Sequence, residues 1–208
     1  MDKGTYLPTP PRPGTTPAWV FTDDRSLLES RTTVLERFRA DFTAIVAASP
    51  APVLVSTLLR NFDYGPTGVF VEGAGGESCR QALAAGPHVR PTATESAAAH
   101  AACGKDSAIA RWSAAQVTRA AGGDPATAWR DSLALDPLPL RAPLEADDLI
   151  REIAAARGVP LVDLAAKLGP FPEGRLFTDT LHPSPEGAQA IAAELLPAVR
   201  AALAERGR

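Results

Sequence analysis

Apolar residues recur at helical spacing in the first quarter of the chain and predict a long amphipathic helix there. One stripe of this helix is apolar and faces a core, while charged side chains occupy its other faces. Thr22, Asp23 and Asp24 can cap its amino end, and Pro50 ends it. The apolar stripe consists of Leu28, Leu35, Phe38, Phe42 and Ile45.

Further helices are predicted in the second half. Residues 94–134 form two helical segments divided at 122–125, and another helix from about 144 to 157 ends at a glycine. Residues 61–91 are rich in Gly and Pro, so we interpret them as a loop that includes a short helix near 80–84.

Short unbroken apolar runs predict buried strands between these helices. The run at 53–58 is the best of them, 159–163 is a second, and 18–21 is a third, shorter one. Alternating strands and helices are typical of a three-layer α/β domain with a mostly parallel sheet. Ligands of such folds bind at the carboxyl ends of the strands, where Thr57 and Asn61 would lie.

The composition fits one domain with one sizeable core. The chain has 208 residues, of which 45% are hydrophobic. We expect an irregular leader at residues 1–17 and a single domain at 18–208, with a helical insertion at about 94–134.

Charge and hydropathy exclude two classes of partner. The formal net charge is −3, and no long run of Lys or Arg provides a basic surface for nucleic acid or an anionic membrane. No apolar run approaches the roughly 20 residues that a membrane-spanning helix needs. The amino end lacks the apolar core of a signal peptide. The sequence therefore predicts no nucleic-acid partner, no membrane association and a cytoplasmic location.

The cysteines and histidines give no pattern of a metal site. Cys79 and Cys103 are too few for a disulfide framework and form no C-x-x-C pair, so we interpret them as ordinary thiols. His88, His100 and His182 have no metal-ligand spacing, so the sequence predicts neither a metal nor another cofactor.

The most informative string is residues 176–187, L-F-T-D-T-L-H-P-S-P-E-G. Asp179 precedes His182 by three residues, so its carboxylate can bind one ring nitrogen and leave the other free as a general base. Ser184 as N-cap and Pro185 at the first helical position would fix the start of the next helix. In that helix, apolar residues recur every four positions and predict a core-facing side. A bare D-x-x-H also occurs where the aspartate merely caps a turn and the histidine lies at the surface.

This string, followed by an amphipathic helix, resembles the fifth sequence block of SGNH (GDSL-type) hydrolases. In that block the Asp and His of a Ser-His-Asp triad lie three residues apart. The resemblance implies an SGNH/flavodoxin-like α/β fold, either complete or truncated, in which Asp179 orients His182 as the base that deprotonates a serine. Residues 50–61, 134–143 and 147–164 resemble other parts of the family with less specificity.

The nucleophile block of the family, a strand leading into Gly-Asp-Ser, is not visible before residue 50. Ser26 and Ser78 lie in its nearest imitations, at 21–26 and 76–78. Ser107 follows an aspartate as well, but its context favours a helix cap.

Three further residues are candidates for substrate binding. Asn61 could donate its amide to an oxyanion, although asparagine after a strand also forms turns. Arg141, on a proline-flanked segment, could bind a carboxylate or phosphate, or lie solvated at the surface. Thr57 is a candidate by position alone.

Two functions follow. The first is an SGNH-like hydrolase or acyltransferase acting on an ester or acyl group of a small molecule, with an unrecognised serine, a second polypeptide or a homo-oligomer completing the site. The second is a degenerate SGNH-like binding or partner subunit that lacks the nucleophile.

Overall fold

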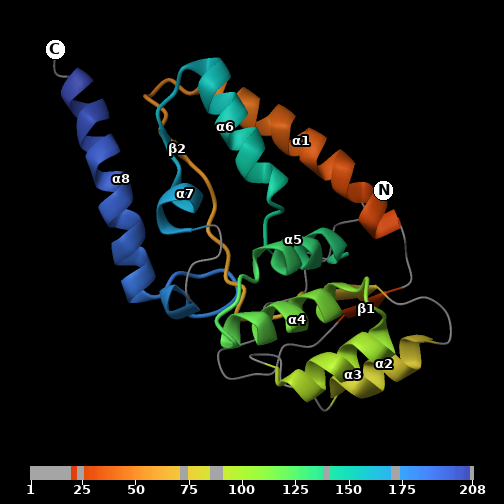
Figure 1. Cartoon of the computed structure of the whole chain (residues 1–208). Helices are drawn as coiled ribbons and strands as arrows, with labels where there is room; N and C mark the ends of the chain where they lie inside the picture. Colours follow the sequence, from red (N-terminus) through yellow and green to blue (C-terminus); the bar gives the residue numbers. More distant parts are fainter. Residues whose placement is uncertain are drawn as a thin grey trace. The chain divides into compact units, whose positions relative to one another are not determined.

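The structure, a computed structural model, describes residues 20–22, 26–70, 75–84, 91–137, 141–169 and 174–206 (Figure 1). It divides the chain into two compact units. Unit 1 comprises Met1–Asp23 and Asp63–Leu140, and unit 2 comprises Asp24–Phe62 and Arg141–Arg208. The helical insertion predicted at about 94–134 falls within unit 1, and the predicted leader lies outside the described residues.

Unit 1 is mainly helical. Its described strands, β1 and β3, pair in parallel, with Val20 opposite Gly68 and Thr22 opposite Phe70. The elements are β1 (Val20–Thr22), β3 (Gly68–Phe70), α2 (Gly75–Ala84), α3 (Ala93–Cys103), α4 (Ala108–Ala120) and α5 (Ala126–Leu135).

Local caps explain where the helices of unit 1 begin. Thr92 and Glu95 form a capping box at the start of α3. The hydroxyl of Ser107 accepts a hydrogen bond from the Ala110 N–H and caps α4, as its context predicts. The break that Ser107 introduces divides residues 94–134 into three helices rather than the predicted two.

Cys79 of α2 and Cys103 of α3 form a disulfide, so their interpretation as ordinary thiols is wrong. Cys79 is fully buried, and the bond ties two neighbouring helices together. The spacing of the two cysteines could not reveal this pair, because a disulfide depends on which helices pack together.

Unit 2 contains a small parallel pair of strands and the longest helices. In the pair, Val55 lies opposite Leu161 and Ser56 opposite Val162. The elements are α1 (Ser26–Ala48), β2 (Val55–Ser56), α6 (Glu145–Arg157), β4 (Leu161–Val162), α7 (Leu164–Leu168), the 3₁₀ turn η1 (Gly174–Leu176) and α8 (Pro185–Arg206). Gly158 ends α6 with a φ of 62°, a left-handed conformation that glycine adopts without strain.

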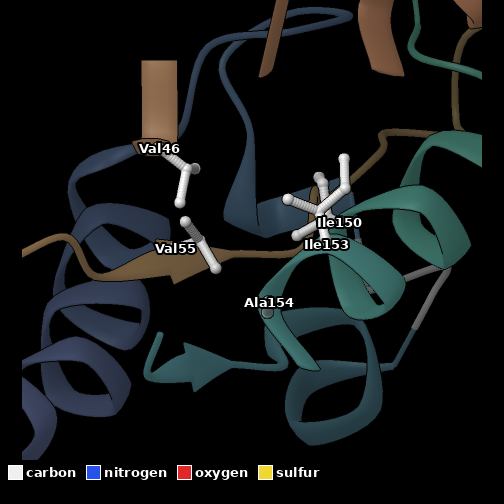
Figure 2. Packing of buried hydrophobic residues seen from close by; sticks show 5 residues of the cluster. All are labelled: Val46, Val55, Ile150, Ile153 and Ala154. Carbon is white, nitrogen blue, oxygen red and sulfur yellow. The ribbon is translucent and has the colours of Figure 1, made fainter. Parts of the chain in front are cut away.

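The core of unit 2 lies where α1 and α6 meet β2. Figure 2 shows Val55 of β2 and Val46 of α1 with apolar side chains of α6. Phe38 and Phe42 of α1, stacked with ring centroids 5.4 Å apart, extend this core. The buried members of the cluster are Val46, Val55, Ile150, Ile153 and Ala154.

The prediction of a three-layer α/β domain with a mostly parallel sheet is wrong. The described chain is mostly helical, and each of its strands has only two or three residues. All three predicted runs do contribute paired residues, at β1, β2 and β4. The Thr57 N–H still donates to the Val162 carbonyl, but the next N–H, that of Leu58, donates to a carboxylate oxygen of Asp147. An apolar run can be buried without continuing the hydrogen-bond ladder of a sheet. Periodicity along the chain also does not reveal how many strands will pair.

Two further expectations concern the apolar side of α8 and membrane-spanning helices. The apolar side of α8 is exposed toward its end, where Leu203 has 61% of its surface accessible, while the helix contacts η1, α7 and β4. Within the described residues, no helix has the length and apolar character needed to cross a membrane.

Candidate functional site

The Asp179–His182 segment is a closed turn in unit 2, between η1 and α8. The Thr178 N–H donates to the His182 carbonyl at 2.9 Å, and Phe177 and Pro183 form an antiparallel bridge. Both ends of the turn are thereby held together, and the side chains of Asp179 and His182 project from the same short loop.

The start of α8 anchors this turn. The hydroxyl of Ser184 accepts a hydrogen bond from the Gly187 N–H at 3.0 Å and donates to the Arg175 carbonyl at 2.7 Å. The Ser184 N–H also donates to the Leu176 carbonyl at 2.9 Å. Ser184 is thus the N-cap and Pro185 the first helical residue, as predicted.

Asp179 and His182 are in direct contact. Oδ2 of Asp179 lies 2.7 Å from Nδ1 of His182, and Oδ1 accepts backbone N–H groups from Leu181 and His182, each at 2.8 Å. Burial works to raise the pKa of Asp179, but the hydrogen bonds from the His182 and Leu181 N–H groups and from the imidazole outweigh it and lower this pKa. The carboxylate is therefore ionised at neutral pH.

An ionised carboxylate next to Nδ1 sets the tautomer of His182. Because both oxygens of Asp179 are acceptors, Nδ1 carries the proton and the lone pair of the neutral ring is on Nε2. The side chain of His182 is 66% exposed, and among the described residues Asp179 is the sole hydrogen-bond partner of its imidazole. Nε2 is available to an external group.

Asn61 is brought to this turn from the segment after β2. Its Nδ2 donates to the Asp179 carbonyl at 2.8 Å, although the two residues are 118 positions apart. Only 1% of Asn61 is exposed. The structure thus gives the amide a contact inside the protein, to the backbone of the orienting carboxylate.

Arg141 is brought to Asn61. Its Nη1 donates to the Asn61 carbonyl at 2.9 Å, and its guanidinium carbon lies 4.6 Å from the centre of the Phe62 ring. The residue is 3% exposed, so the alternative of a solvated surface arginine is wrong.

The Thr57 side chain is hydrogen-bonded to the carboxylate of Asp163 and not to that of Asp179. Its hydroxyl donates to Asp163 at 2.9 Å and accepts the Ala165 N–H at 2.9 Å. Asp163 also binds Arg151, and chiefly this hydrogen-bonded ion pair lowers the pKa of Asp163 to about 2. These contacts join β2 to the start of α7 and do not bring Thr57 to the Asp179 turn.

A buried ion pair holds the same segment and was not expected from the sequence. Arg60 donates to Asp147 at 2.6 Å and to the carbonyls of Ala142 and Pro143. The side chains of Arg60 and Asp147 are 1% and 4% exposed. The only signal was a charged residue directly after an apolar run.

The candidate nucleophiles remain unassigned. Ser107 is occupied as the cap of α4, Ser78 lies on an exposed turn of α2, and Ser26 is the first residue of α1. His88 lies outside the described residues. In the described ranges, no group of three or more His, Cys, Asp or Glu side chains is arranged to hold a metal ion.

Comparisons with protein-family models, with curated proteins and with solved structures found no significant match to this chain.

Proposed function

We propose that Asp179 and His182 form the acid–base part of a site that hydrolyses or transfers the acyl group of a small-molecule ester. The observation that carries this proposal is the 2.7 Å contact between Oδ2 of Asp179 and Nδ1 of His182, with the Nε2 edge of the exposed ring left open. This pairing prepares an imidazole to accept a proton. The resemblance of residues 176–187 to the last SGNH block supports the same chemistry.

In the reaction, Nε2 of His182 takes the proton of a serine hydroxyl as its oxygen attacks the ester carbonyl. Asp179 stabilises the imidazolium that forms. The tetrahedral intermediate then collapses, and the imidazolium returns the proton to the departing alkoxide. Water or an acceptor alcohol repeats these steps on the acyl-serine. No cofactor is required.

The serine is the missing part. We propose that a residue of this chain not yet recognised, or one from a second polypeptide or a second copy, approaches the open edge of His182. A pre-formed Asp–His pair requires only that the hydroxyl come within hydrogen-bond reach of Nε2.

The alternative is a degenerate SGNH-like binding or partner subunit. It is favoured by one observation, that no serine among the described residues is hydrogen-bonded to the His182 imidazole. In that case His182 would contribute to ligand affinity and not to turnover.

Fluorophosphonate labelling, read by intact mass and peptide mapping, distinguishes the two. A hydrolase gives one serine adduct that disappears in His182→Ala. The matched control is His100→Ala, which removes an exposed histidine from α3 of unit 1. An adduct that persists in His182→Ala contradicts the catalytic proposal, and the absence of any adduct on the folded protein excludes a nucleophilic serine within this chain.

A further inference from the structure

The segment after β2 supplies the contact that holds the backbone at Asp179. Both oxygens of the Asp179 carboxylate bond within the turn itself, to Leu181 and His182. Its carbonyl oxygen instead accepts the Asn61 amide, which belongs to a segment 118 residues earlier. The orientation of the carboxylate relative to the rest of unit 2 therefore depends on where Asn61 lies.

Asn61 is itself fixed on both sides. Arg141 donates to its carbonyl oxygen and lies over the ring of the next residue, Phe62. On the other side, Arg60 is bound by the buried carboxylate of Asp147. Because Asn61 and Arg141 are at most 3% exposed, their side chains lie inside the protein.

We infer that Asn61 and Arg141 are positioning residues for the Asp179–His182 pair and do not bind substrate. The effect of these residues on catalysis rests on the proposed function, whereas their effect on the structure of the turn does not. Arg141 holds Asn61, Asn61 holds the Asp179 carbonyl, and the ordered turn presents the carboxylate to Nδ1 of His182. This positioning role replaces the oxyanion and anion-binding roles for which the sequence made these two residues candidates.

Amide hydrogen exchange tests the inference without requiring activity. In Asn61→Leu, which has a similar volume but no donor, we expect the N–H groups of Leu181 and His182 to exchange about tenfold faster, because one buried hydrogen bond is lost. Amides in the middle of α6 should keep their protection, which shows that unit 2 is folded. Unchanged exchange at Leu181 and His182 in the folded variant would overturn the inference.

Arg141 offers a graded pair of variants. Arg141→Met removes the donor to Asn61, whereas Arg141→Lys keeps a cation and a donor on a flexible stem. We expect fast exchange at Leu181 and His182 in the first and partial recovery in the second. Equal exchange rates in the two variants contradict a role for the donor.

Catalytic readouts separate this inference from the proposed function. If the chain is a hydrolase, Asn61→Leu lowers kcat about tenfold or more and leaves KM nearly unchanged, since the side chain does not touch substrate. A raised KM with unchanged kcat would instead indicate substrate binding and overturn the inference. If wild-type protein has no activity and forms no fluorophosphonate adduct, the proposed function fails for a serine of this chain, while the exchange results still decide the positioning role.

The disulfide of unit 1 carries a second, independent inference. Cys79 is fully buried on α2 and is bonded to the last residue of α3. Two thiols form this bond by losing two electrons and two protons to a thiol oxidant, a disulfide-bearing oxidoreductase. Structural disulfides persist in oxidising compartments and are rare where cellular thiols stay reduced.

We propose that the chain folds and remains in an oxidising compartment, in place of the cytoplasm that the sequence predicts. Cells that make the protein are lysed directly into denaturant with an alkylating reagent, and the chain is analysed by mass. A chain without adducts that yields a linked Cys79–Cys103 peptide is the expected result. Two alkylated cysteines would overturn the proposal.

Discussion

The carbonyl oxygen of Leu176 occupies the space that a side chain at position 187 would need. A Cβ atom built on Gly187 would lie 1.9 Å from this oxygen and 2.8 Å from its carbonyl carbon. The same oxygen accepts a hydrogen bond from the Ser184 N–H, so η1 packs closely against the first turn of α8. Only a glycine allows the His182 turn to close in this way.

Replacing Gly187→Ala should therefore destabilise unit 2. In a helix without this contact, the change would stabilise by up to about 1 kcal/mol. Here we expect a loss of about 2 kcal/mol or more in the free energy of unfolding, because the obstruction is backbone and cannot rotate away. Chemical denaturation of the full chain measures it. A stabilised variant would show that η1 does not approach α8 this closely.

Replacing Asp179→Asn should abolish most activity while preserving the fold. The amide keeps the shape of the side chain but cannot both hold the Nδ1 proton and stabilise an imidazolium. If the chain is a hydrolase, we expect kcat to fall by about 10³ to 10⁴-fold, measured with an activated acyl ester. Glu186→Gln, which removes a charge from the adjoining first turn of α8, is the control and should change kcat less than threefold. A similar kcat in wild type and Asp179→Asn would exclude Asp179 as the orienting acid.

Local chemistry made part of this site predictable. The contact between Asp179 and His182, the Ser184 cap and the start of α8 all lie within a few residues, where spacing determines what can touch. The end of α1 before Pro50 and the end of α6 at a left-handed glycine follow from local signals for the same reason. Each of these signals acts over one or two turns of chain.

Contacts between distant segments were not predictable. Asn61 and Asp179 are 118 residues apart, and Cys79 and Cys103 belong to different helices. The same limitation explains the error in fold class. The apolar character of residues 53–58 indicates burial, but it does not indicate how many of these residues pair with another strand. These features depend on which elements meet, and a pattern along one segment carries no information about its partner.

The Asp163–Arg151 pair should make stability depend on pH in the acid range. The pKa of Asp163 is lowered from its ordinary value of 3.8 to about 2, chiefly by the hydrogen bond from Arg151. The folded state therefore gains stability from this ionised group above about pH 4 and loses it as the pH falls toward 2. Because both partners are partly exposed, we expect a contribution of about 1 kcal/mol.

Denaturation of wild type and Arg151→Gln at pH 7 and at pH 2 tests this linkage. The variant should be less stable at pH 7 by about 1 kcal/mol, and the difference should shrink at pH 2, where Asp163 is largely protonated in either protein. A difference that grows on acidification has the opposite sign to the one expected from a lowered pKa.

The buried pair of Arg60 and Asp147 should be costly to break. Removing one partner leaves the other charge without compensation inside unit 2, so Asp147→Asn or Arg60→Met should lower the free energy of unfolding by about 3 to 5 kcal/mol. The exposed pair of Arg39 and Glu152 is the matched comparison, and Arg39→Ala should cost much less than either change at the buried pair. Removing both partners with Arg60→Met and Asp147→Leu should cost less than the sum of the single changes, because no unpaired charge remains. Equal losses at the buried and exposed pairs in chemical denaturation would mean that water reaches Arg60. The segment that carries Asn61 would then be open to solvent.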